Sequence, residues 1–576
     1  MCSADGLTEF ARLCIERITF DGLAGPQLLI VDGEQPQASP LSTKLRKAVR
    51  FESTLWYIQS RLFPLNQIPA YRREPLESCL ANVPSIVCVP QKKGKWSQYF
   101  SSADVDTIKS HELDFILRFG FGIIRGDVLN AAKYGVWSFH HDDEDKYRGG
   151  PPAFWELYQN DPVSGAMLQR LTDTLDGGIV LKKCSVPTNR LSYRRNLQRI
   201  LHASTNMVRW VCVDLANGRA DYLNAPPSRT KAPIYHAPND FQMLRFWAQL
   251  GLNWLAYKKE NQCVDVWNVG VVNAPQAAFL DPAFVPEVEW TAYSKPDKVV
   301  ADPFLVPPST PGGPLRIVAE ELDWYNECGT ICELRRDSQS GKVTFDKTII
   351  DEGVHMSYPF IFQYNGDTFM VPEAASLKAI VLYRMDRRTG EFQMHSTLID
   401  NVNASDSTLF EHDCRWWLIH TGNGKLCPWS LYVWHAATPF GPWEAHTASP
   451  VKTDVSSTRP AGNPFVKDGQ LYRPAQDNRH WYGYGLTLNR IDELTTTAFR
   501  ETVVRRIGAD PKSPYPDGCH ALAGYGNITL IDGKRHRWPL GLILRRIMRK
   551  RLGLGQPKPA LQPMQVVRAK SMSVGK

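Results

Sequence analysis

The chain has 576 residues, a formal net charge of +8 and 43% hydrophobic residues. This length excludes a single hydrophobic core and predicts two or three domains. The 12 cysteines are scattered singly, which excludes a zinc framework and a disulfide-rich secreted scaffold. No apolar run is long enough for a transmembrane helix and no signal peptide opens the chain, so we expect a cytoplasmic protein.

Residues 1–188 have the pattern of an α/β domain. Helical spacing predicts a helix over residues 7–18, and buried strands are predicted over residues 27–31, 86–89, 115–119 and 136–140. A further helix is predicted before the last strand, ending at Lys133. This order predicts a Rossmann-like parallel sheet with helices on its faces. Because a strand normally precedes the first helix, we expect either that the sheet lacks its first strand or that the natural start lies upstream.

Residues 189–262 are predicted to be a mixed, largely helical connecting segment, and short strands with turns begin at residue 263. An apolar anchoring residue then recurs at positions 304, 360, 410, 465 and 522, at intervals of 50 to 57 residues. Each anchor is followed by a turn and a second strand. Five units of about 50 residues, with roughly four strands each, predict a five-bladed β-propeller over residues 263–535. A two-sheet sandwich would explain the strand density but not the regular interval.

Residues 536–576 form a basic tail. From residue 534 onward there are twelve lysines or arginines and no acidic residue, so the rest of the chain is mildly acidic. Apolar and basic residues alternate at helical spacing over residues 540–551. Such a helix suits an anionic membrane surface, which would make the protein peripheral to the membrane. A disordered tail and contact with nucleic acid are the alternatives, and we do not expect nucleic acid as a partner.

Ser138, His140 and Asp176 form the first candidate site. His140 ends a predicted strand and Asp176 lies in a turn beside the next one, where open α/β sheets place their chemistry. A histidine paired with a carboxylate can act as a general base. A structural histidine in a polar turn is the alternative.

The motifs around this site resemble those of the formyltransferase family, which includes methionyl-tRNA and sugar N-formyltransferases. They are Ser138-Phe139-His140, Tyr147-Arg148-Gly149 followed by two prolines, and Leu175-Asp176-Gly177-Gly178. The resemblance implies transfer of a formyl group from N10-formyltetrahydrofolate to an amine. It implies that His140 assists proton removal from the amine and that Asp176 holds His140 or a bridging water. It also implies a folate-binding set: Gly120, Phe121, Gly122, Ile123, Arg148 and Gly149.

Two positions depart from the family pattern. Ser138 stands where the family has an Asn whose amide donates to the developing oxyanion, and loss of such a donor costs about 10²–10³ in rate. The loop after His140 reads His141-Asp142-Asp143-Glu144-Asp145 in place of an uncharged loop. These acids favour a cationic acceptor or a metal, or they form a solvated loop. We assign no metal site, because the candidate ligands cluster in one loop.

A second candidate site is predicted on the propeller axis. The residues two positions before the anchors are Asp302, Tyr358, Thr408, Asn463 and His520, and the second strands end near Glu320, Glu373, His420, Arg473 and Asp477. Innermost strands would point such residues into one axial funnel. Asp302 and Glu373, with Asp406 as a third carboxylate, would resemble the acids of arabinanase- and invertase-type glycoside hydrolases. The predicted axial set is Asp302, Tyr358, Glu373, Asp406, Asn463, Arg473 and His520.

Residues 265–535 also resemble the N-terminal propeller domain of plant glucosamine inositolphosphorylceramide transferase. The likeness lies in residues 357–360, 459–463 and 473–477. It implies a fold and a link to glycans. Together the two resemblances predict a formyltransferase-like enzyme that acts on an amino sugar or related amine and carries a glycan-binding propeller. The alternative is a degenerate formyltransferase domain beside a glycan-binding or glycoside-processing propeller.

Overall fold

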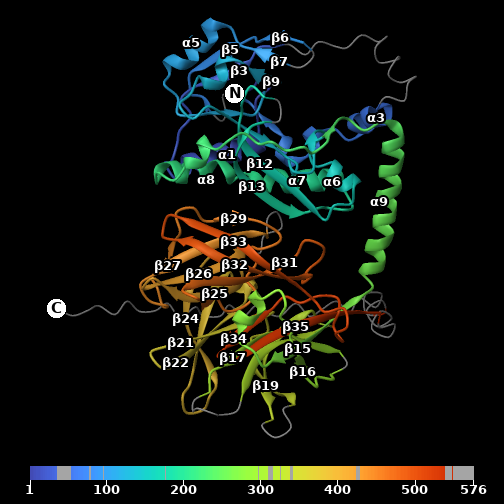
Figure 1. The fold of residues 1–576 in the computed structure, drawn as a ribbon, viewed down its shortest axis with the longest axis vertical. Helices are drawn as coiled ribbons and strands as arrows, with labels where there is room; N and C mark the ends of the chain where they lie inside the picture. Colours follow the sequence, from blue (N-terminus) through green and yellow to red (C-terminus); the bar gives the residue numbers. More distant parts are fainter. Residues whose placement is uncertain are drawn as a thin grey trace, which may run out of the picture. The chain divides into compact units, whose positions relative to one another are not determined.

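The chain divides into two compact units, residues 1–257 (unit 1) and residues 258–576 (unit 2), shown in Figure 1. The structure is a computed structural model. It describes Met548 and residues 1–34, 53–76, 80–94, 97–174, 177–295, 297–308, 315–324, 326–337, 342–422 and 428–538.

Unit 1 is built from short strands and helices. Its strands are β1 (Cys2–Ser3), β2 (Leu7–Thr8), β3 (Leu29–Asp32), β4 (Arg73–Glu74), β5 (Ser85–Cys88), β6 (Gln91–Lys93), β7 (Ser97–Tyr99), β8 (Ile116–Arg118), β9 (Ile123–Arg125), β10 (Val136–His140), β11 (Arg148–Gly149), β12 (Val163–Arg170), β13 (Ile179–Pro187) and β14 (Ile234–Tyr235). Its helices are α1 (Glu9–Phe20), α3 (Thr54–Leu62), α5 (Ser102–Ser110), α6 (Trp155–Tyr158), α7 (Tyr193–Ser204), α8 (Met207–Ala216) and α9 (Asp240–Glu260), with 3-10 turns η1 (Leu65–Gln67), η2 (Pro69–Tyr71), η3 (Asp127–Asn130) and η4 (Asp221–Asn224).

The centre of the unit 1 sheet is formed by the first residues of the chain. β1 pairs in parallel with β3, and β3 pairs in parallel with β5. On the other side, the Met1 amine donates to the Leu117 carbonyl at 2.8 Å, and Phe119 N donates to the Met1 carbonyl at 2.9 Å. The expectation of a missing first strand is therefore wrong. The strand is present in a central position, but it is too short to produce a periodic hydrophobic signal.

The other half of the sheet contains the strand of the first candidate site. β10 pairs in parallel with β8 and antiparallel with β12, which pairs with β13. The first three residues of β10, Val136 to Ser138, are all buried, as in a strand that is covered on both faces. The predicted helix ending at Lys133 is wrong. Gly126 has a φ of 80° that a helix cannot contain, so this segment forms β9 and η3 instead.

Residues 189–257, predicted as a connecting segment, belong to unit 1. Helices α7 and α8 contact both β12 and β13. The buried Asn196 amide of α7 donates to Ala153 O at 3.0 Å and to Ser164 Oγ at 2.9 Å. These contacts make α7 and α8 one of the helical layers that cover the sheet. The sequence signal for this layer was weak because a Pro-rich break follows it.

In its described part, unit 2 is all β apart from the last residues of α9, the helical Met548 and the 3-10 turns η5 (Gln276–Leu280) and η6 (Ala375–Leu377). Its strands are β15 (Val264–Val272), β16 (Val288–Trp290), β17 (Lys298–Val306), β18 (Arg316–Asp323), β19 (Cys328–Arg336), β20 (Val343–Ile350), β21 (Ser357–Tyr364), β22 (Asp367–Glu373), β23 (Ala379–Met385), β24 (Phe392–Asp400), β25 (Ala404–His412), β26 (Arg415–Gly422), β27 (Ser430–Ala436), β28 (Glu444–Ala445), β29 (Lys452–Thr453), β30 (Phe465–Lys467), β31 (Gln470–Asp477), β32 (Gly485–Leu494), β33 (Phe499–Gly508), β34 (Leu522–Tyr525) and β35 (Ile528–Arg537).

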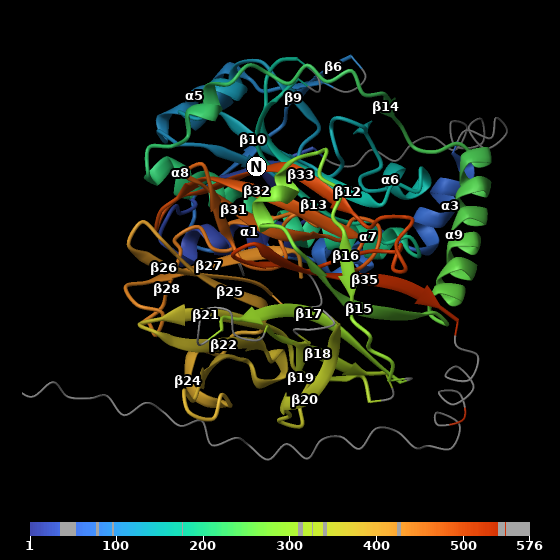
Figure 2. The ribbon, with the colours of Figure 1, turned by 60° about the horizontal axis from the view of Figure 1, so that its bottom comes forward.

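These strands form five antiparallel sheets. Sheet 1 is β17-β18-β19-β20, sheet 2 is β21-β22-β23-β24, sheet 3 is β25-β26-β27-β28 with β29 on β27, sheet 4 is β30-β31-β32-β33, and sheet 5 is β16-β15-β35-β34. Sheet 5 joins the two ends of the unit, because β15 pairs with β35 along its whole length. The first strands lie side by side, since β21 contacts β17 and β25, and β17 contacts β34 (Figure 1 and Figure 2). The all-β prediction is confirmed. Four of the five sheets have four strands and sheet 3 has five, an arrangement that agrees with the predicted propeller rather than with a two-sheet sandwich.

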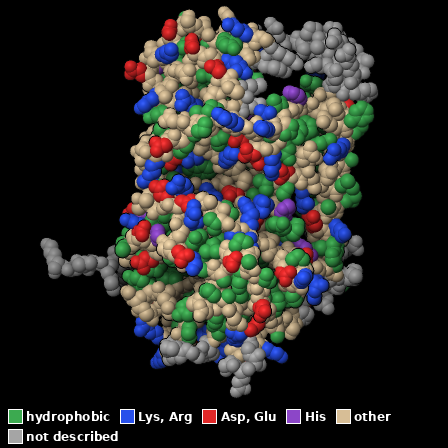
Figure 3. Space-filling view, in the orientation of Figure 1, with side chains coloured by type: hydrophobic (Ala, Val, Ile, Leu, Met, Phe, Trp, Pro, Cys, Tyr) green, Lys and Arg blue, Asp and Glu red, His purple; other side chains and the backbone are tan. Residues whose placement is uncertain are grey.

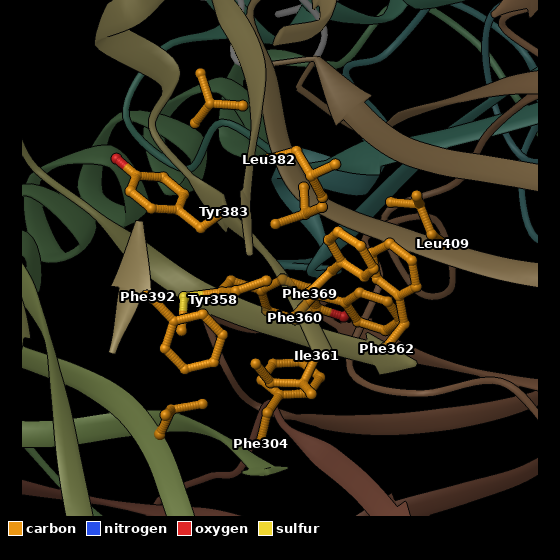
Figure 4. Close-up of a cluster of buried hydrophobic side chains, with 14 of the residues drawn as sticks. Phe304, Tyr358, Phe360, Ile361, Phe362, Phe369, Leu382, Tyr383, Phe392 and Leu409 are labelled. Carbon is orange, nitrogen blue, oxygen red and sulfur yellow. The ribbon is translucent and has the colours of Figure 1, made fainter. Parts of the chain in front are cut away.

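Aromatic side chains fill the space between the first three sheets of unit 2. The Phe304 ring of β17 lies 4.9 Å from the Tyr358 ring and 5.5 Å from the Phe360 ring of β21. Figure 4 shows these rings with Phe362 and Leu409 in the same buried cluster. Each such burial contributes about 1.5–3 kcal/mol. The anchors predicted at 304 and 360 therefore fix the first strands against one another.

The predicted membrane-binding tail, residues 540–551, lies outside the described residues apart from Met548. Within the described part of the chain, no helix has the length and apolar character to cross a membrane. On the face shown in Figure 3, acidic and basic side chains are interspersed over the described surface.

Candidate functional site

The first candidate site contains a half-buried arginine, Arg118, that the sequence did not reveal. Ser138 of β10 lies opposite Arg118 of β8 in the parallel register. Ser138 Oγ accepts hydrogen bonds from Arg118 Nε at 3.1 Å and Nη2 at 2.9 Å. The same guanidinium donates to the carbonyls of Phe121 at 3.2 Å and Gly122 at 2.7 Å. Only the strand pairing singles out Arg118, because no motif surrounds it.

His140, the predicted base, is partly buried at the end of β10. Its Nε2 lies 3.3 Å from the Tyr147 carbonyl and 3.8 Å from Asp142 Oδ2. Asp142 Oδ1 in turn accepts a hydrogen bond from Ala153 N at 2.8 Å. Among the described residues, Asp142 therefore places a carboxylate beside His140. Asp176 lies outside the described residues, so its pairing with His140 stays a prediction.

The acidic run after His140 is packed into unit 1. Asp142 and Glu144 are buried, and Glu144 and Asp145 pair with Lys183 at 3.1 and 2.9 Å. The interpretation of a solvated acidic loop is therefore wrong for Asp142 and Glu144. Burial raises the pKa of Asp142 well above its usual range and that of the neighbouring Glu156 to about 7. We therefore expect this pair to hold a proton near neutral pH.

His141, which follows His140 in the chain, packs among aromatic side chains. His141 stacks on Phe139 with ring centroids 5.7 Å apart and lies edge-on to Phe10 at 5.2 Å. Burial lowers the pKa of His141 to about 3, so the ring is neutral. His141 therefore packs the interior, whereas His140 is the partly exposed histidine of the site.

The predicted folate loop has a constrained backbone. Gly120 allows no side chain, because a Cβ there would lie 2.8 Å from the Cys2 backbone. Phe121 has a φ of 65°, and Gly122 N donates to Gln98 Oε1. Ile123 begins β9, an edge strand that pairs with β7. The loop between Gly120 and Ile123 is thus held at both ends.

Arg148 and Gly149 have contacts of a different kind. They form β11, which pairs with β14, and Arg148 Nε donates to Ala232 O at 2.7 Å. Gly149 has a φ of 92° and permits close approach of the Tyr235 carbonyl. Arg148 and Gly149 therefore support the β11–β14 contact.

A cavity of about 430 Å³ in unit 1 is lined by α1, β3 and residues 111–117, and by none of the predicted site residues.

The second candidate site begins with a backbone feature shared by three sheets. A bulge interrupts the pairing of β17, β21 and β25, and its residues Asp302, Tyr358 and Asp406 have φ values of 50°, 44° and 54°. Non-glycine residues rarely adopt this left-handed conformation, and functional sites are where it concentrates. The structurally equivalent position in sheet 3 is Asp406, so the predicted register at Thr408 is wrong by two residues.

Asp302 meets sheet 5 at the centre of unit 2. His520 Nδ1 lies 3.6 Å from Asp302 Oδ1 and contacts Asp532 Oδ2 directly. Asp532 Oδ1 accepts the backbone N–H of His520 at 2.7 Å and of Ala521 at 3.0 Å. The His520 ring stacks on Trp267 with centroids 4.0 Å apart. Asp532 was missed by the sequence because β35 follows the last repeat signal.

Sheets 2, 3 and 4 meet at Arg459, which the sequence also missed. Its guanidinium donates two hydrogen bonds to Asp406 and lies 3.7 Å from Glu373 Oε2. Glu373 also accepts from Ser405 Oγ at 3.2 Å and Asp406 N at 3.1 Å. The Tyr358 hydroxyl contacts Thr408 Oγ1 at 2.9 Å and accepts from Gly462 N at 2.8 Å. A buried polar network therefore joins the first strands of the sheets.

Two predicted axial residues lie outside this network. Arg473 is buried, but its guanidinium pairs with Glu501 at 2.7 Å and donates to the Ser457 and Thr458 carbonyls within sheet 4. Asn463 contributes its carbonyl, which accepts from Gln276 Nε2 at 2.9 Å. The prediction that Arg473 faces the axis is wrong because alternate residues of β31 point to opposite sides. Arg459, and not Arg473, is the arginine that contacts Asp406 and Glu373.

The ionisation of the axial acids is strongly perturbed. Burial raises the pKa of Asp302 to about 7 and that of Glu373 to about 8. Burial raises the pKa of Glu320 well above its usual range, with Asp302, Glu373 and Asp406 as like charges nearby. The carboxylates of Asp302 and Asp532 raise the pKa of His520 against the effect of burial. Such shifts concentrate at functional sites.

Asp302, His520 and Asp532 bring three ligand-type atoms within 4.8 Å of one another. Carboxylate and imidazole donors of this kind can hold a divalent cation. His520 Nδ1 lies in direct contact with Asp532 Oδ2 and 3.6 Å from Asp302 Oδ1, so this nitrogen faces two carboxylates. The three side chains form a close cluster in which neither Asp302 Oδ1 nor His520 Nδ1 has a hydrogen-bond partner among the described residues.

The fold and the sites define a protein of two units. In the α/β unit, strand β10 ends in His140, and the all-β unit contains a cluster of buried acidic side chains. Residues 267–514 match the family model described as Glucosamine inositolphosphorylceramide transferase 1, N-terminal. The enzyme of that name from Oryza sativa subsp. japonica is 34% identical over 255 residues, which cover 42% of this chain and 34% of the relative.

The N-terminal region is similar to formyltransferases. Methionyl-tRNA formyltransferase of Prochlorococcus marinus is 30% identical over 103 residues, covering 18% of this chain and 30% of the relative. The chain thus spans about a third of the length of these curated relatives. Among solved structures, the exo-β-1,3-galactanase of Phanerochaete chrysosporium aligns over 38% of this chain and 57% of that one, with 12% identity and a TM-score of 0.29.

Proposed function

We propose that the chain is a transferase that moves a formyl group from N10-formyltetrahydrofolate to the amine of an amino sugar, with unit 1 as the catalytic unit. The observation that carries the proposal is His140 at the end of β10, beside the Arg118–Ser138 pair. The similarity of the N-terminal region to methionyl-tRNA formyltransferases supports the reaction class.

The residues of the site have chemically separate tasks in this proposal. The amine must lose a proton as it is acylated, and His140 accepts it as a general base. The Asp142 carboxyl, 3.8 Å from His140 Nε2, sets the electrostatic environment of the ring. Arg118 is a cationic hydrogen-bond donor next to Ser138 and takes over the donor function for which the family uses an Asn amide.

The loop residues are of a type that can bind a formyl donor with a pterin ring. β9 is an edge strand, and within the described residues its outer side has no strand partner. An open strand edge offers backbone N–H and C=O groups to a ligand with a matching donor and acceptor edge, which a pterin ring has. When bound, N10-formyltetrahydrofolate supplies the formyl carbon. Gly120 to Ile123 would hold it, and Arg118 fixes the Phe121 and Gly122 carbonyls of that loop.

For unit 2, we propose that the five sheets are the blades of a propeller whose centre binds the glycan. The buried network of Asp302, Glu373, Asp406 and Arg459 supports this assignment. A second function, cleavage of a glycosidic bond, is favoured by one observation. Asp302 and Glu373 have raised pKa values, which suits a general acid, and Asp406 accepts a hydrogen bond from Arg459.

The test uses the full chain, N10-formyltetrahydrofolate and glucosamine. We expect release of tetrahydrofolate together with N-formylglucosamine, measured by absorbance and mass spectrometry. His140→Ala should lower the rate by about 10²–10⁴. His236→Ala, at an exposed histidine of unit 1, is the matched control and should retain the wild-type rate.

Failure of the wild-type chain to form the N-formyl product with any amino sugar would contradict the proposal. Release of a reducing sugar from aryl glycosides would favour the second function. That release should then be lost in Asp302→Asn and unchanged in His140→Ala.

A further inference from the structure

The centre of unit 2 holds more carboxyl groups than it has positively charged groups to pair with them. Five carboxylates from five strands meet there: Asp302, Glu320, Glu373, Asp406 and Asp532. Among the described residues, the cations that face them are Arg459 and His520. Lys534 lies 3.6 Å from Asp265, so this pair adds no net charge.

Three of the five carboxylates have partners of their own. Asp406 accepts from Arg459 and from Gln476 Nε2 at 2.9 Å. Asp532 pairs with His520 and accepts from three backbone N–H groups, those of Asp302, His520 and Ala521. Glu373 accepts from Ser405 Oγ and a backbone N–H. Arg459 and His520 are thereby committed to these partners.

The other two carboxylates present an unused oxygen each. Asp302 Oδ1 and Glu320 Oε1 are buried and have no hydrogen-bond partner among the described residues. Their residues are only 4% and 7% exposed. The neighbouring imidazoles lie at 3.6 Å for Asp302 and 3.8 Å for Glu320, which is too far for a hydrogen bond. A buried acceptor without a donor is costly, and here two occur in one cluster.

The fold makes specific room for the Glu320 carboxylate. A Cβ at position 329 would lie 2.4 Å from Glu320 Oε1 and 2.5 Å from the Met356 carbonyl, so only Gly329 fits. Gly329 N also donates to His355 Nδ1 at 2.8 Å, which turns His355 Nε2 toward Glu320. Burial lowers the pKa of His355, so this ring supplies no positive charge. The unused oxygen of Glu320 is therefore a built feature.

Flat aromatic surfaces adjoin the cluster. The Tyr482 ring lies edge-on to His520 with centroids 5.2 Å apart, and His520 stacks on Trp267. Arg459 lies over the Tyr482 ring at 5.3 Å. Tyr482 is 44% exposed, so part of this residue is open to solvent beside the acids. Exposed aromatic rings beside polar side chains suit a sugar ring, which is apolar on one face and polar at its edge.

We infer that this cluster, Asp302 and Glu320 foremost, binds the primary ammonium group of an amino sugar. An ammonium has three N–H donors and no acceptor, which matches two orphan acceptors in an acidic site. The choice of a sugar as the carrier of the amine rests on the proposed function. A site of this kind selects the free amine over its acylated form, because an amide nitrogen carries no positive charge. Unit 2 would thereby recognise the substrate of the formyl transfer and release its product.

The ionisation of the site agrees with a cationic ligand. Without one, burial keeps protons on Asp302 and Glu373, whose pKa values are raised to about 7 and about 8. A bound ammonium stabilises the ionised carboxylates, so binding should release protons at neutral pH. The other titratable groups near the cluster include Glu320, Asp406, Asp532, Arg459, His520, His355, Tyr358, Tyr482, Lys534 and Cys519.

Calorimetry on the full chain tests the inference, with glucosamine, N-acetylglucosamine, N-formylglucosamine, ethylenediamine and Ca²⁺ as separate titrants. We expect glucosamine to bind at least about tenfold more tightly than both acylated sugars and than ethylenediamine, since a hydrogen bond to a charged group contributes that much. The heat should depend on the ionisation enthalpy of the buffer because protons are released.

Two variants and one control locate the site. Asp302→Asn and Glu320→Gln should each weaken glucosamine binding about tenfold or more. Asn is well tolerated at the left-handed position 302, and circular dichroism checks the fold of both variants. Glu411→Gln, at an exposed position of the same β25 strand that carries Asp406, should bind like the wild type.

Equal affinity for glucosamine and N-acetylglucosamine would overturn the inference. So would tight binding of Ca²⁺ that Asp302→Asn abolishes while glucosamine gives no heat, which would assign a metal site, and so would preference for ethylenediamine. Selective glucosamine binding without any formyl transfer would contradict the proposed function and leave the inference intact. Formyl transfer in a chain that does not bind glucosamine selectively at unit 2 would do the reverse.

Discussion

Arg459, in the segment between sheets 3 and 4, is joined by two hydrogen bonds to Asp406, the left-handed bulge residue of β25. Asp406 is 1% exposed, and Arg459 is also 3.7 Å from Glu373 of β22. One guanidinium therefore compensates two buried carboxylates from two sheets. We therefore expect the pairing of Arg459 with these carboxylates to contribute to the free energy of unfolding of unit 2.

Arg459→Leu should destabilise unit 2 by about 3–5 kcal/mol, because it leaves a buried carboxylate without its partner. Urea denaturation followed by tryptophan fluorescence measures the change. Arg387→Ala, which breaks a solvent-exposed pair with Asp367, should cost less than about 1 kcal/mol. The double variant Arg459→Leu/Asp406→Leu should recover part of the loss. Equal stability of Arg459→Leu and Arg387→Ala would contradict the assigned role.

The stability of unit 2 should fall as the pH rises from about 5 to about 8. Asp302 and Glu373 have pKa values of about 7 and about 8 in the folded protein, above the usual 3.8 and 4.5 of the unfolded chain. The folded state therefore binds more protons in this window, and its stability decreases with pH. Denaturation midpoints at pH 5 and 8 measure the slope. Glu373→Gln should flatten it, and a slope unchanged in Glu373→Gln would contradict the assignment.

The elements of both units could be predicted from the sequence where a hydrophobic period is long enough to be visible. β10 was predicted with its observed bounds, and the second strands of all five repeats were recognised. β1 was not, because two residues give no period. The predicted helix before β10 failed at Gly126, whose φ of 80° ends any helix.

The axial site could be predicted only in part. Asp302, Glu373 and Asp406 follow from the repeat and its carboxylates. Thr408 was placed two residues out of register. The residue that follows the bulge is Phe304 in β17 and Phe360 in β21 but the polar Thr408 in β25, so the apolar anchor of sheet 3 was taken two residues too late, at position 410. Arg459 and Arg473 are indistinguishable by type, and only their partners Asp406 and Glu501 separate an axial arginine from one inside a sheet.

Gly329→Ala should destabilise unit 2 by about 1–3 kcal/mol, the usual cost of overpacking. The added Cβ would lie 2.4 Å from Glu320 Oε1, so the carboxylate must move. Gly508→Ala is the matched control, because that position is open and its backbone is extended, and we expect a change below about 0.5 kcal/mol. Thermal unfolding of the two variants makes the comparison. A Gly329→Ala protein as stable as the control would show that Glu320 is free to move.

Arg118 and Ser138 should contribute unequally to formyl transfer. If the guanidinium has taken over the donor function of the family's Asn, Arg118→Met should lower kcat by about 10²–10³. Ser138→Ala should cost less than about tenfold, because Arg118 keeps its bonds to the Phe121 and Gly122 carbonyls. Steady-state kinetics separate kcat from KM, and binding of 5-formyltetrahydrofolate controls for loss of the loop. Loss of kcat in Ser138→Ala but not in Arg118→Met would instead make the hydroxyl the donor, with Arg118 serving only to orient it.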